Sequence, residues 1–226
     1  MRLDSMAAVL RRATDQFALF FPRSTEQLDD VFRLRYQVYC LERGFEPAED
    51  GRERDEFDPF SRHAVIRHRG NHQAVGTVRL VAAVAGSAPY LPLTQACDPA
   101  LVQHLPRAST AEISRFALSK RYRAETGLSE PLLRLFLMRG IVALSGELGL
   151  THWCALMEPC LLRLLRMTAI HFQPAGPLVE HHGLRQPSTA RIGDVLCRMH
   201  HEQPLIWDFI TDAGSLWQDR DLPVAA

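Results

Sequence analysis

Apolar patterns typical of strands and of helices alternate along this chain of 226 residues, and their order limits the folds available to it. Short or period-two apolar runs predict strands over residues 17–21, 64–67, 74–84, 111–118, 151–157, 179–182 and 205–210. Helical spacing predicts helices over residues 5–13, 24–40, 131–148 and 159–168, the second of them with Ser24 as its N-cap. Such alternation predicts an α/β or α+β layer fold with helices packed on a mixed sheet.

Length and composition favour one folded domain. With 46% hydrophobic and 23% charged residues, the chain can bury a sizeable core. We therefore expect a single domain over residues 1–226, with a helical appendage at residues 1–16 and a flexible tail at residues 213–226. Lys and Arg total 26, as do Asp and Glu, so no net charge attracts nucleic acid or an anionic membrane surface.

The cysteines and the N-terminus indicate where the protein works. The five cysteines are odd in number, scattered and without a CxxC pair, which disfavours a disulfide framework and predicts reduced thiols in the cytoplasm. The N-terminus has neither the apolar run nor the cleavage site of a signal peptide. We also predict no transmembrane segment.

Charged residues gather in three short motifs beside strand-like residues, at positions 53–58, 76–80 and 112–116. Residues 42–58 hold eight acidic residues and three arginines, whereas residues 115–139 hold six basic residues and two acidic ones. Carboxylates can hold and deprotonate an amine, and neighbouring arginines keep those carboxylates ionised. We therefore predict a polar cleft suited to N-acyl transfer, with a cationic acceptor near the first segment and an anionic donor near the second.

The segment between residues 120 and 129 predicts the donor side of that cleft. It contains Gly127 and precedes a helix beginning at Pro131, and the backbone N–H groups of such a helix N-terminus suit a pyrophosphate or phosphopantetheine group. A glycine in a strand-to-helix turn also has a purely structural explanation. Basic side chains placed to meet an acidic carrier protein are Lys120, Arg121, Arg123 and Arg134.

Four motifs together resemble one group of enzymes. They are Leu34-Arg35-Tyr36-Gln37-Val38-Tyr39, Glu-x-Asp-x-Phe-Asp at 53–58, Gly-x-x-Arg-Leu at 76–80 and Glu-x-Ser-Arg-Phe at 112–116. Their order and spacing resemble the autoinducer (acyl-homoserine-lactone) synthase family. They look closer still to the long-chain N-acyl amino acid synthases and to the acyltransferases associated with PEP-CTERM/exosortase systems. The resemblance extends over residues 17–212.

The resemblance implies a GNAT-like fold in which an acyl thioester lies in a V-shaped gap between two central strands. It implies no tightly bound cofactor, and an amine that attacks an acyl-carrier-protein or acyl-coenzyme A thioester. The residues that match charged site positions of the family are Arg35, Glu53, Asp55, Asp58, Arg79, Glu112 and Arg115. Phe45 matches an aromatic position of the lactone synthases, and Tyr39 stands where they usually have phenylalanine.

The reaction assigns roles to these residues. An α-amine is mostly protonated at neutral pH, so it needs a base before it can attack. Glu112 is the preferred base and Asp55 the reserve, whereas Glu53 and Asp58 hold the acceptor or the loop. Backbone N–H groups from Phe116 to Leu118 are the candidate oxyanion donors. Since period-two alternation puts Glu112 and Arg115 on opposite faces, both line the site only if a β-bulge lies near Ser114.

Three functional classes remain open. They are an N-acyltransferase acting on an amino acid or similar amine, a lactone synthase using S-adenosylmethionine, and an inactive protein that binds acyl thioesters. The sequence lacks most of what distinguishes S-adenosylmethionine from an ordinary amino acid as acceptor. The charged motifs also have structural explanations. The acidic loop at residues 44–58 could be a solvated surface, and Arg79 and Glu112 could form an ion pair between strands. The histidine pairs at 181–182 and 200–201 lack metal-ligand spacing, so we predict no metal site.

Overall fold

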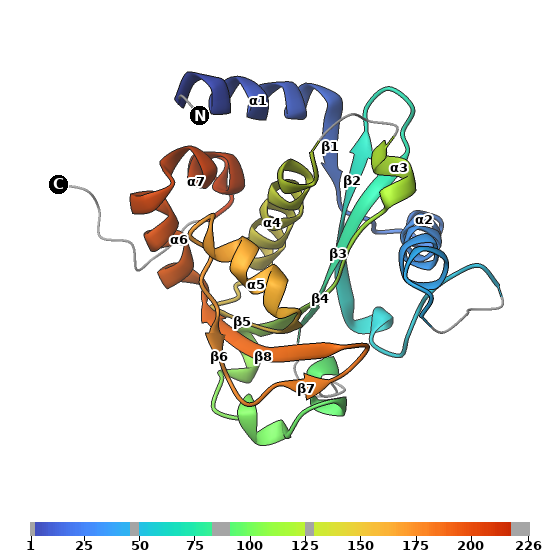
Figure 1. The fold of residues 1–226 in the computed structure, drawn as a ribbon, viewed down its shortest axis with the longest axis vertical. Coiled ribbons are helices and arrows are strands. Elements are labelled where there is room, and N and C mark those ends of the chain that lie inside the picture. Colours follow the sequence, from blue (N-terminus) through green and yellow to red (C-terminus); the bar gives the residue numbers. More distant parts are fainter. Residues whose placement is uncertain (1–2, 46–49, 83–90, 125–128, 218–226) are drawn as a thin grey trace. The chain divides into compact units, whose positions relative to one another are not determined.

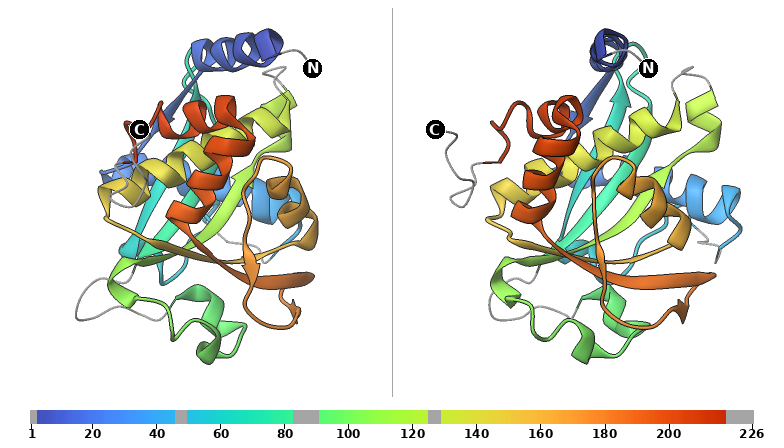
Figure 2. Two further views of the ribbon diagram at one scale, coloured as in Figure 1. Left: turned by 90° about the vertical axis from the view of Figure 1, so that its left-hand side faces the viewer. Right: turned by 60° about the vertical axis from the view of Figure 1, so that its left-hand side comes forward.

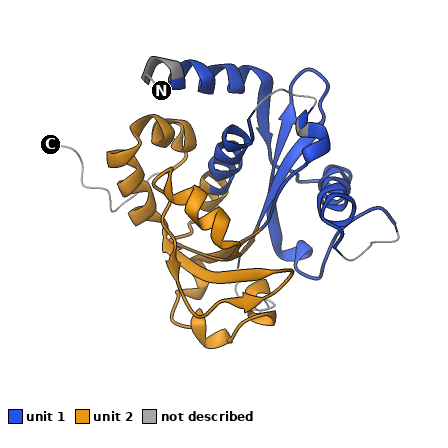
Figure 3. Ribbon diagram, in the orientation of Figure 1, with its two compact units in different colours: residues 1–79, 115–141 blue, residues 80–114, 142–226 orange. Residues whose placement is uncertain are grey.

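A computed structural model describes residues 3–45, 50–82, 91–124 and 129–217 of the protein. They fall into two compact units (Figure 3). Unit 1 comprises Met1–Arg79 and Arg115–Ile141, and unit 2 comprises Leu80–Ser114 and Val142–Ala226. Each unit is therefore built from two stretches of chain.

The strands form a mixed sheet (Figure 1). Their bounds are β1 Phe17–Phe20, β2 Ser61–His68, β3 Ala74–Ala82, β4 Thr110–Leu118, β5 His152–Met157, β6 Gln173–Pro174, β7 Val179–Glu180 and β8 Leu184–Arg191. Their order is β1-β2-β3-β4-β5-β8-β6, and β7 pairs with β8. Pairing is antiparallel for β1–β2 and β5–β8 and parallel for β4–β5. The predicted mixed α/β fold is confirmed.

The helices follow the alternation expected from the sequence. The α-helices are α1 Leu3–Gln16, α2 Thr25–Arg35, α3 Lys120–Ala124, α4 Glu130–Glu147, α5 Pro159–Arg166, α6 Ile192–Glu202 and α7 Pro204–Thr211. A π-helix, η1 (Tyr36–Glu42), continues α2, and short 3₁₀ turns are η2 Asp58–Phe60, η3 Pro92–Gln95, η4 Pro99–Leu101 and η5 Arg107–Ser109. None of the helices in the described ranges combines the length and hydropathy of a membrane span.

Helix α2 begins at a capping box, as Ser24 predicts. The Ser24 hydroxyl accepts the Gln27 N–H at 3.3 Å, and the Gln27 side chain accepts the Ser24 N–H at 3.2 Å. These two bonds satisfy N–H groups that the first turn of a helix leaves unpaired. The helix start is thereby fixed by local sequence.

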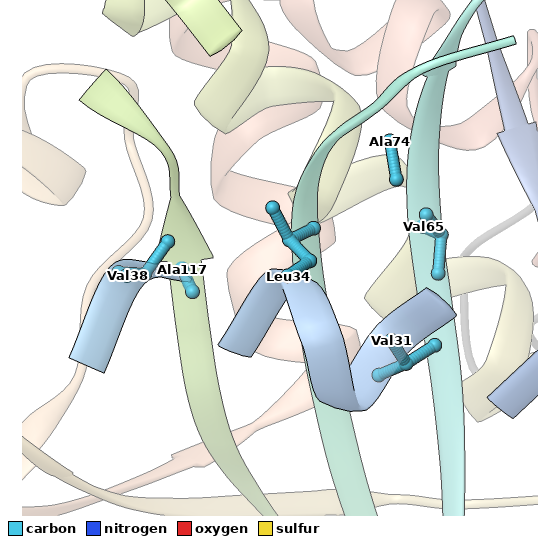
Figure 4. Packing of buried hydrophobic residues seen from close by; sticks show 6 residues of the cluster. All are labelled: Val31, Leu34, Val38, Val65, Ala74 and Ala117. Carbon is cyan, nitrogen blue, oxygen red and sulfur yellow. The ribbon is translucent and has the colours of Figure 1, made fainter. Parts of the chain in front are cut away.

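In unit 1, α2 and η1 cover one face of the strands (Figure 4). Helical spacing places apolar side chains on one side of these helices, where they pack against single residues of β2, β3 and β4. The cluster consists of Val31, Leu34, Val38, Val65, Ala74 and Ala117. Burying each of the larger side chains stabilises the fold by about 1.5–3 kcal/mol.

Helix α4 covers the opposite face of β2 in the same unit. Ala64 and Val65 are adjacent on a strand, so their side chains point to opposite faces. Val65 packs under α2, whereas a Cβ added at Gly140 of α4 would come within 2.6 Å of the Ala64 Cβ. Glycine at this position therefore lets α4 approach the sheet closely.

Unit 2 is organised around β8. This strand pairs along one edge with the whole of β5 and along the other with β6 and β7. The chain then continues directly into α6, and α7 follows and contacts α6 (Figures 1 and 2). Fully buried Trp153 of β5 donates through Nε1 to the Ser145 hydroxyl at 2.9 Å, so α4 and β5 are also joined within this unit.

Two predictions for unit 2 were wrong. Residues 205–210 form helix α7, not a strand, because Pro204 suits a first helical position and Ile206, Phe209 and Ile210 bury one helical face. A short apolar run does not distinguish the two. Strand β8 was missed because it contains Pro187, which lacks an N–H group. The Pro187 carbonyl still accepts the Ala175 N–H at 2.9 Å.

Candidate functional site

Arg35 connects the end of α2 to the acidic loop, residues 44–58. It lies four residues after Val31 on the buried side of the helix, and its side chain is completely buried. Its Nη1 donates to Asp58 Oδ1 at 2.6 Å, and its Nε donates to Glu53. The buried charge of Arg35 is thus paired, and the loop is held against the helix.

Arg79 of β3 brings a second buried guanidinium to the same loop. Its Nη1 donates to Asp55 Oδ1 at 2.5 Å and to Asp58 Oδ1 at 2.9 Å. A single oxygen of Asp58 therefore accepts from both Arg35 and Arg79. The other oxygen, Oδ2, accepts the Asp55 N–H at 2.8 Å, which fixes the loop around it.

Arg115 of β4 completes the arrangement from a third element. Its Nε donates to Glu53 Oε1 at 3.0 Å, and its Nη2 donates to Asp55 Oδ2 at 2.9 Å. Its backbone is left-handed, with φ at +49°, which non-glycine residues rarely adopt within a strand. This irregularity lies one residue beyond Ser114, where the sequence predicts a bulge.

These residues form one ion cluster in unit 1. We use that name for Arg35, Glu53, Asp55, Asp58, Arg79 and Arg115. Three guanidiniums balance three carboxylates, so the ion cluster carries no net charge. Its exposure is graded: the side chains of Arg35 and Arg79 are 0% exposed, whereas that of Arg115 is 29% exposed. One edge of the ion cluster is therefore exposed to solvent.

The arginines keep the carboxylates ionised, as predicted. Burial alone would raise each carboxyl pKa, but hydrogen bonding and charge from Arg35 lower the pKa of Glu53, and the same effects from Arg79 lower that of Asp55. Burial opposes the shift at Asp58 as well, yet the charge of Arg35 lowers its pKa to about 2. A carboxylate with a lowered pKa is a weak base, which favours a holding role for these residues.

Tyr39 and Phe45 place an aromatic surface beside this edge. Their rings stack with centroids 6.0 Å apart, and the Arg115 guanidinium lies over the Tyr39 ring at 5.6 Å. Tyr39 belongs to the π-helix η1, a geometry that often marks functional sites in helices. Burial raises the pKa of the Tyr39 hydroxyl, so it stays protonated.

Glu112 lies on β4 within unit 2, three residues before Arg115. Its side chain is buried, and Oε2 accepts the Leu93 N–H at 2.7 Å. Leu93 and its neighbours Cys97 and Cys154 belong to one apolar cluster. Burial and the charge of Glu112 together raise the pKa of both thiols. Glu112 therefore holds η3 against β4, whatever else it does.

The predicted donor residues are only partly placed. Lys120 and Arg121 begin the short helix α3 with exposed side chains, and their backbone N–H groups donate to Glu42 at 2.8 and 3.3 Å. Sequence reasoning did not select Glu42, which lies at the end of η1. Arg134 pairs with Glu130 on α4. The side chain of Arg123 and all of Gly127 lie outside the described residues, and Phe116 is partly buried on β4.

His63, a buried histidine that belongs to none of the sequence motifs, lies beside the ion cluster. His63 of β2 is 2% exposed, and its Nε2 lies 3.6 Å from Asp58 Oδ1. Burial, followed by the charge of Arg35, lowers its pKa to about 3, so the ring is neutral. Among the described residues, no group of three or more His, Cys, Asp or Glu side chains could hold a metal ion.

Comparisons with known proteins agree with this geometry. A family model, the acetyltransferase (GNAT) domain, matches residues 34–130, which include every member of the ion cluster. Residues 34–130 therefore resemble a GNAT acyltransferase domain. This match confirms the predicted enzyme class, an acyltransferase. Among curated proteins, no sequence matches significantly.

Several solved structures are similar to this chain, and two of them are described as acyl-transferring synthases. MesI, a CoA-dependent acyl-homoserine lactone synthase, is 20% identical with a TM-score of 0.62, covering 89% of this chain and 97% of its own. FeeM, an N-acyl amino acid synthase from uncultured soil microbes, is 13% identical with a TM-score of 0.62, covering 83% and 97%. TofI, solved with an inhibitor and MTA, is 20% identical with a TM-score of 0.62, covering 84% and 96%. These similarities confirm the GNAT-like fold.

Proposed function

We propose that the protein is an N-acyltransferase that moves a long-chain fatty acyl group from a carrier-protein or coenzyme A thioester to an amino acid or similar amine. The graded exposure of the ion cluster carries this proposal. Its exposed edge presents the side chains of Glu53 and Asp55, which are 16% and 23% exposed, beside Arg115 and the Tyr39 ring. Carboxylate oxygens and an aromatic face bind an ammonium group, and a guanidinium binds a carboxylate.

The buried half of the ion cluster has a supporting role. It consists of Arg35, Arg79 and Asp58, whose side chains are 0%, 0% and 6% exposed. These residues therefore orient Glu53 and Asp55 without touching substrate. Orientation of this kind contributes to rate because a displaced reactant loses much of the benefit of proximity. Asp55 and Arg115 are thereby assigned to the acceptor, with Tyr39 and Phe45 as its aromatic wall.

Glu112 is proposed as the base that removes a proton from the bound amine, directly or through a water. Its bond from the Leu93 N–H orients the carboxylate on a strand that also carries Arg115. A backbone N–H between Phe116 and Leu118 would then donate to the oxyanion of the tetrahedral intermediate.

The donor is proposed to approach α3 and the start of α4. The exposed side chains of Lys120 and Arg121 suit an acidic carrier protein, with Arg123, Gly127 and Arg134 as further contacts. Among the similar structures, MesI is described as CoA-dependent, so both thioesters belong in the assay. The V-shaped gap, the single-domain organisation, the cytoplasmic location, the absence of a tightly bound cofactor and the association with PEP-CTERM systems remain predictions.

A lactone synthase is the second candidate, favoured by the fold that this chain shares with MesI. Such an enzyme would consume S-adenosylmethionine and release methylthioadenosine. Product analysis distinguishes the two, because the first candidate releases only the free carrier or coenzyme A together with an N-acyl amine. A protein that only binds acyl thioesters would form neither product.

Mass spectrometry of lipid extracts from cells overproducing the protein tests the proposal. The matched variants are Glu112→Gln and, as a control on the surface of the same unit, Glu202→Gln. We expect new N-acyl species that persist with Glu202→Gln and vanish with Glu112→Gln. Lipids unchanged by overproduction, with purified protein that still binds an acyl carrier protein, would favour the binding role instead.

A further inference from the structure

His63 is buried in a way that its own contacts do not explain. Neither ring nitrogen has a hydrogen-bond partner among the residues that the structure describes, although the side chain is only 1% exposed. Buried polar groups are nearly always paired, and an unpaired one destabilises the folded state. A phenylalanine would fill the same space without that cost, so stability alone does not account for histidine here.

The surroundings of His63 indicate what the ring does. It lies on the same face of β2 as Val65, beneath α2, and its edge meets the Phe32 ring with centroids 6.2 Å apart at 90°. The Arg35 guanidinium lies over that same Phe32 ring at 5.5 Å. His63 and Arg35 therefore share two neighbours, the Phe32 ring and the Asp58 carboxylate.

Asp58 Oδ1 is the shared acceptor of the ion cluster. Arg35 and Arg79 donate to it at 2.6 and 2.9 Å, and His63 Nε2 stands at 3.6 Å, just beyond hydrogen-bond range. An anionic oxygen favours the tautomer with hydrogen on Nε2. A displacement of well under an ångström brings this N–H into bonding distance.

We propose that His63 is a positioning residue: its neutral ring is a reserve donor that keeps Asp58 in place while Arg35 and Arg79 adjust to a bound acceptor. This inference rests on the proposed function. When a substrate carboxylate or ammonium group binds at the exposed edge of the ion cluster, the guanidiniums of Arg35 and Arg79 shift. Asp58 Oδ1 then loses part of its hydrogen bonding. The His63 N–H then replaces it. A charged histidine would upset the balance of three cations and three anions, which the low pKa of His63 prevents.

Two substitutions separate this role from simple packing. His63→Phe keeps the ring and its contact with Phe32 but removes the donor, whereas His63→Gln restores an N–H near the position of Nε2. Wild type and both variants are compared by thermal unfolding and by kinetics that vary the amine and the acyl thioester separately. The exchange rate of the Arg35 Nε–H, followed by NMR with and without the amine, gives a readout that needs no turnover.

We expect His63→Phe to unfold at or above the wild-type temperature, yet to lose at least about tenfold in kcat/KM for the amine, with KM for the thioester unchanged. His63→Gln should regain part of that loss. In His63→Phe the Arg35 Nε–H should exchange faster once amine is bound. The inference would be overturned if His63→Phe had wild-type kinetics. It would also be overturned if both variants lost kcat/KM for the amine equally and in proportion to a lowered unfolding temperature. If the wild-type protein transferred an acyl group to no amine, the proposed function would be overturned instead. In that case, an Arg35 Nε–H exchange rate that is the same in His63→Phe and in wild type would overturn this inference as well.

Discussion

Arg35 and Asp58 form a buried ion pair in which Nη1 of the arginine donates to Oδ1 of the aspartate at 2.6 Å, with 0% and 6% of their side chains exposed. Because Arg79 donates to the same oxygen, Asp58→Ala leaves two buried guanidiniums short of an acceptor. We expect this variant to lose about 3–5 kcal/mol in free energy of unfolding. Urea unfolding measures the loss. As control, Glu202→Ala breaks an exposed pair with Arg198 and should cost less than about 1 kcal/mol. Similar losses in the two variants would contradict the central position of Asp58.

Acid should destabilise the protein through His63 well before the carboxylates titrate. The pKa of His63 falls from 6.5 to about 3 on folding, so its titration has no effect on stability above pH 6.5 and destabilises the folded state as pH falls toward 3. The free energy of unfolding should therefore decline by up to about 1.4 kcal/mol per pH unit below 6.5. Urea unfolding at pH 7.5 and 5.5 measures this decline, which should be smaller in His63→Phe. Identical pH dependence in the two proteins would mean that folding leaves the pKa of His63 unchanged.

Two substitutions at Glu112 should separate its structural bond from its proposed chemistry. Glu112→Gln retains an oxygen that can accept the Leu93 N–H, so unfolding should change little while turnover falls by about a hundredfold. Glu112→Ala leaves that N–H buried and unpaired, at a cost of about 1–3 kcal/mol in the free energy of unfolding. Thermal unfolding alongside turnover checks both expectations. Normal turnover in the glutamine variant would remove Glu112 as the base.

Gly140→Ala should reverse the usual effect of alanine in a helix. Alanine is better than glycine by about 1 kcal/mol in a helix interior, but here its Cβ would meet the Ala64 Cβ at 2.6 Å. We expect a net loss of about 1–3 kcal/mol as α4 moves away from β2. Urea unfolding gives the sign directly, and a more stable variant would show that α4 shifts at no cost.

Most of the fold could be predicted because its elements carry local signals. The capping box at Ser24 and the apolar spacing of α2 and α4 mark their own positions. The errors fell where local sequence is ambiguous. A six-residue apolar run at 205–210 suits a strand or a helix, and only tertiary packing decides. Pro187 argued against a strand, yet it lies in β8, which pairs with β5 and with β6.

The members of the ion cluster could be predicted from motifs, but their arrangement could not. Sequence spacing does not show that Asp58 Oδ1 serves two arginines, because that depends on how the loop folds around the Asp55 N–H. The left-handed backbone conformation of Arg115 could not be predicted from the sequence either, since arginine has no preference for that conformation. His63 was expected to be structural, because a single histidine in an apolar strand normally indicates packing.

The π-helix η1 sets the direction in which the residues within and after it point. Its i to i−5 bond, from the Arg43 N–H to the Val38 carbonyl at 3.1 Å, accommodates more residues per turn than an α-helix does. If η1 took up ordinary α-helical winding with all of its residues retained, everything after it would turn by about 100°. Tyr39 would then leave the Arg115 guanidinium, and Glu42 would leave α3. A change of winding alone would thus separate the aromatic wall from α3, although every side chain involved would still be present.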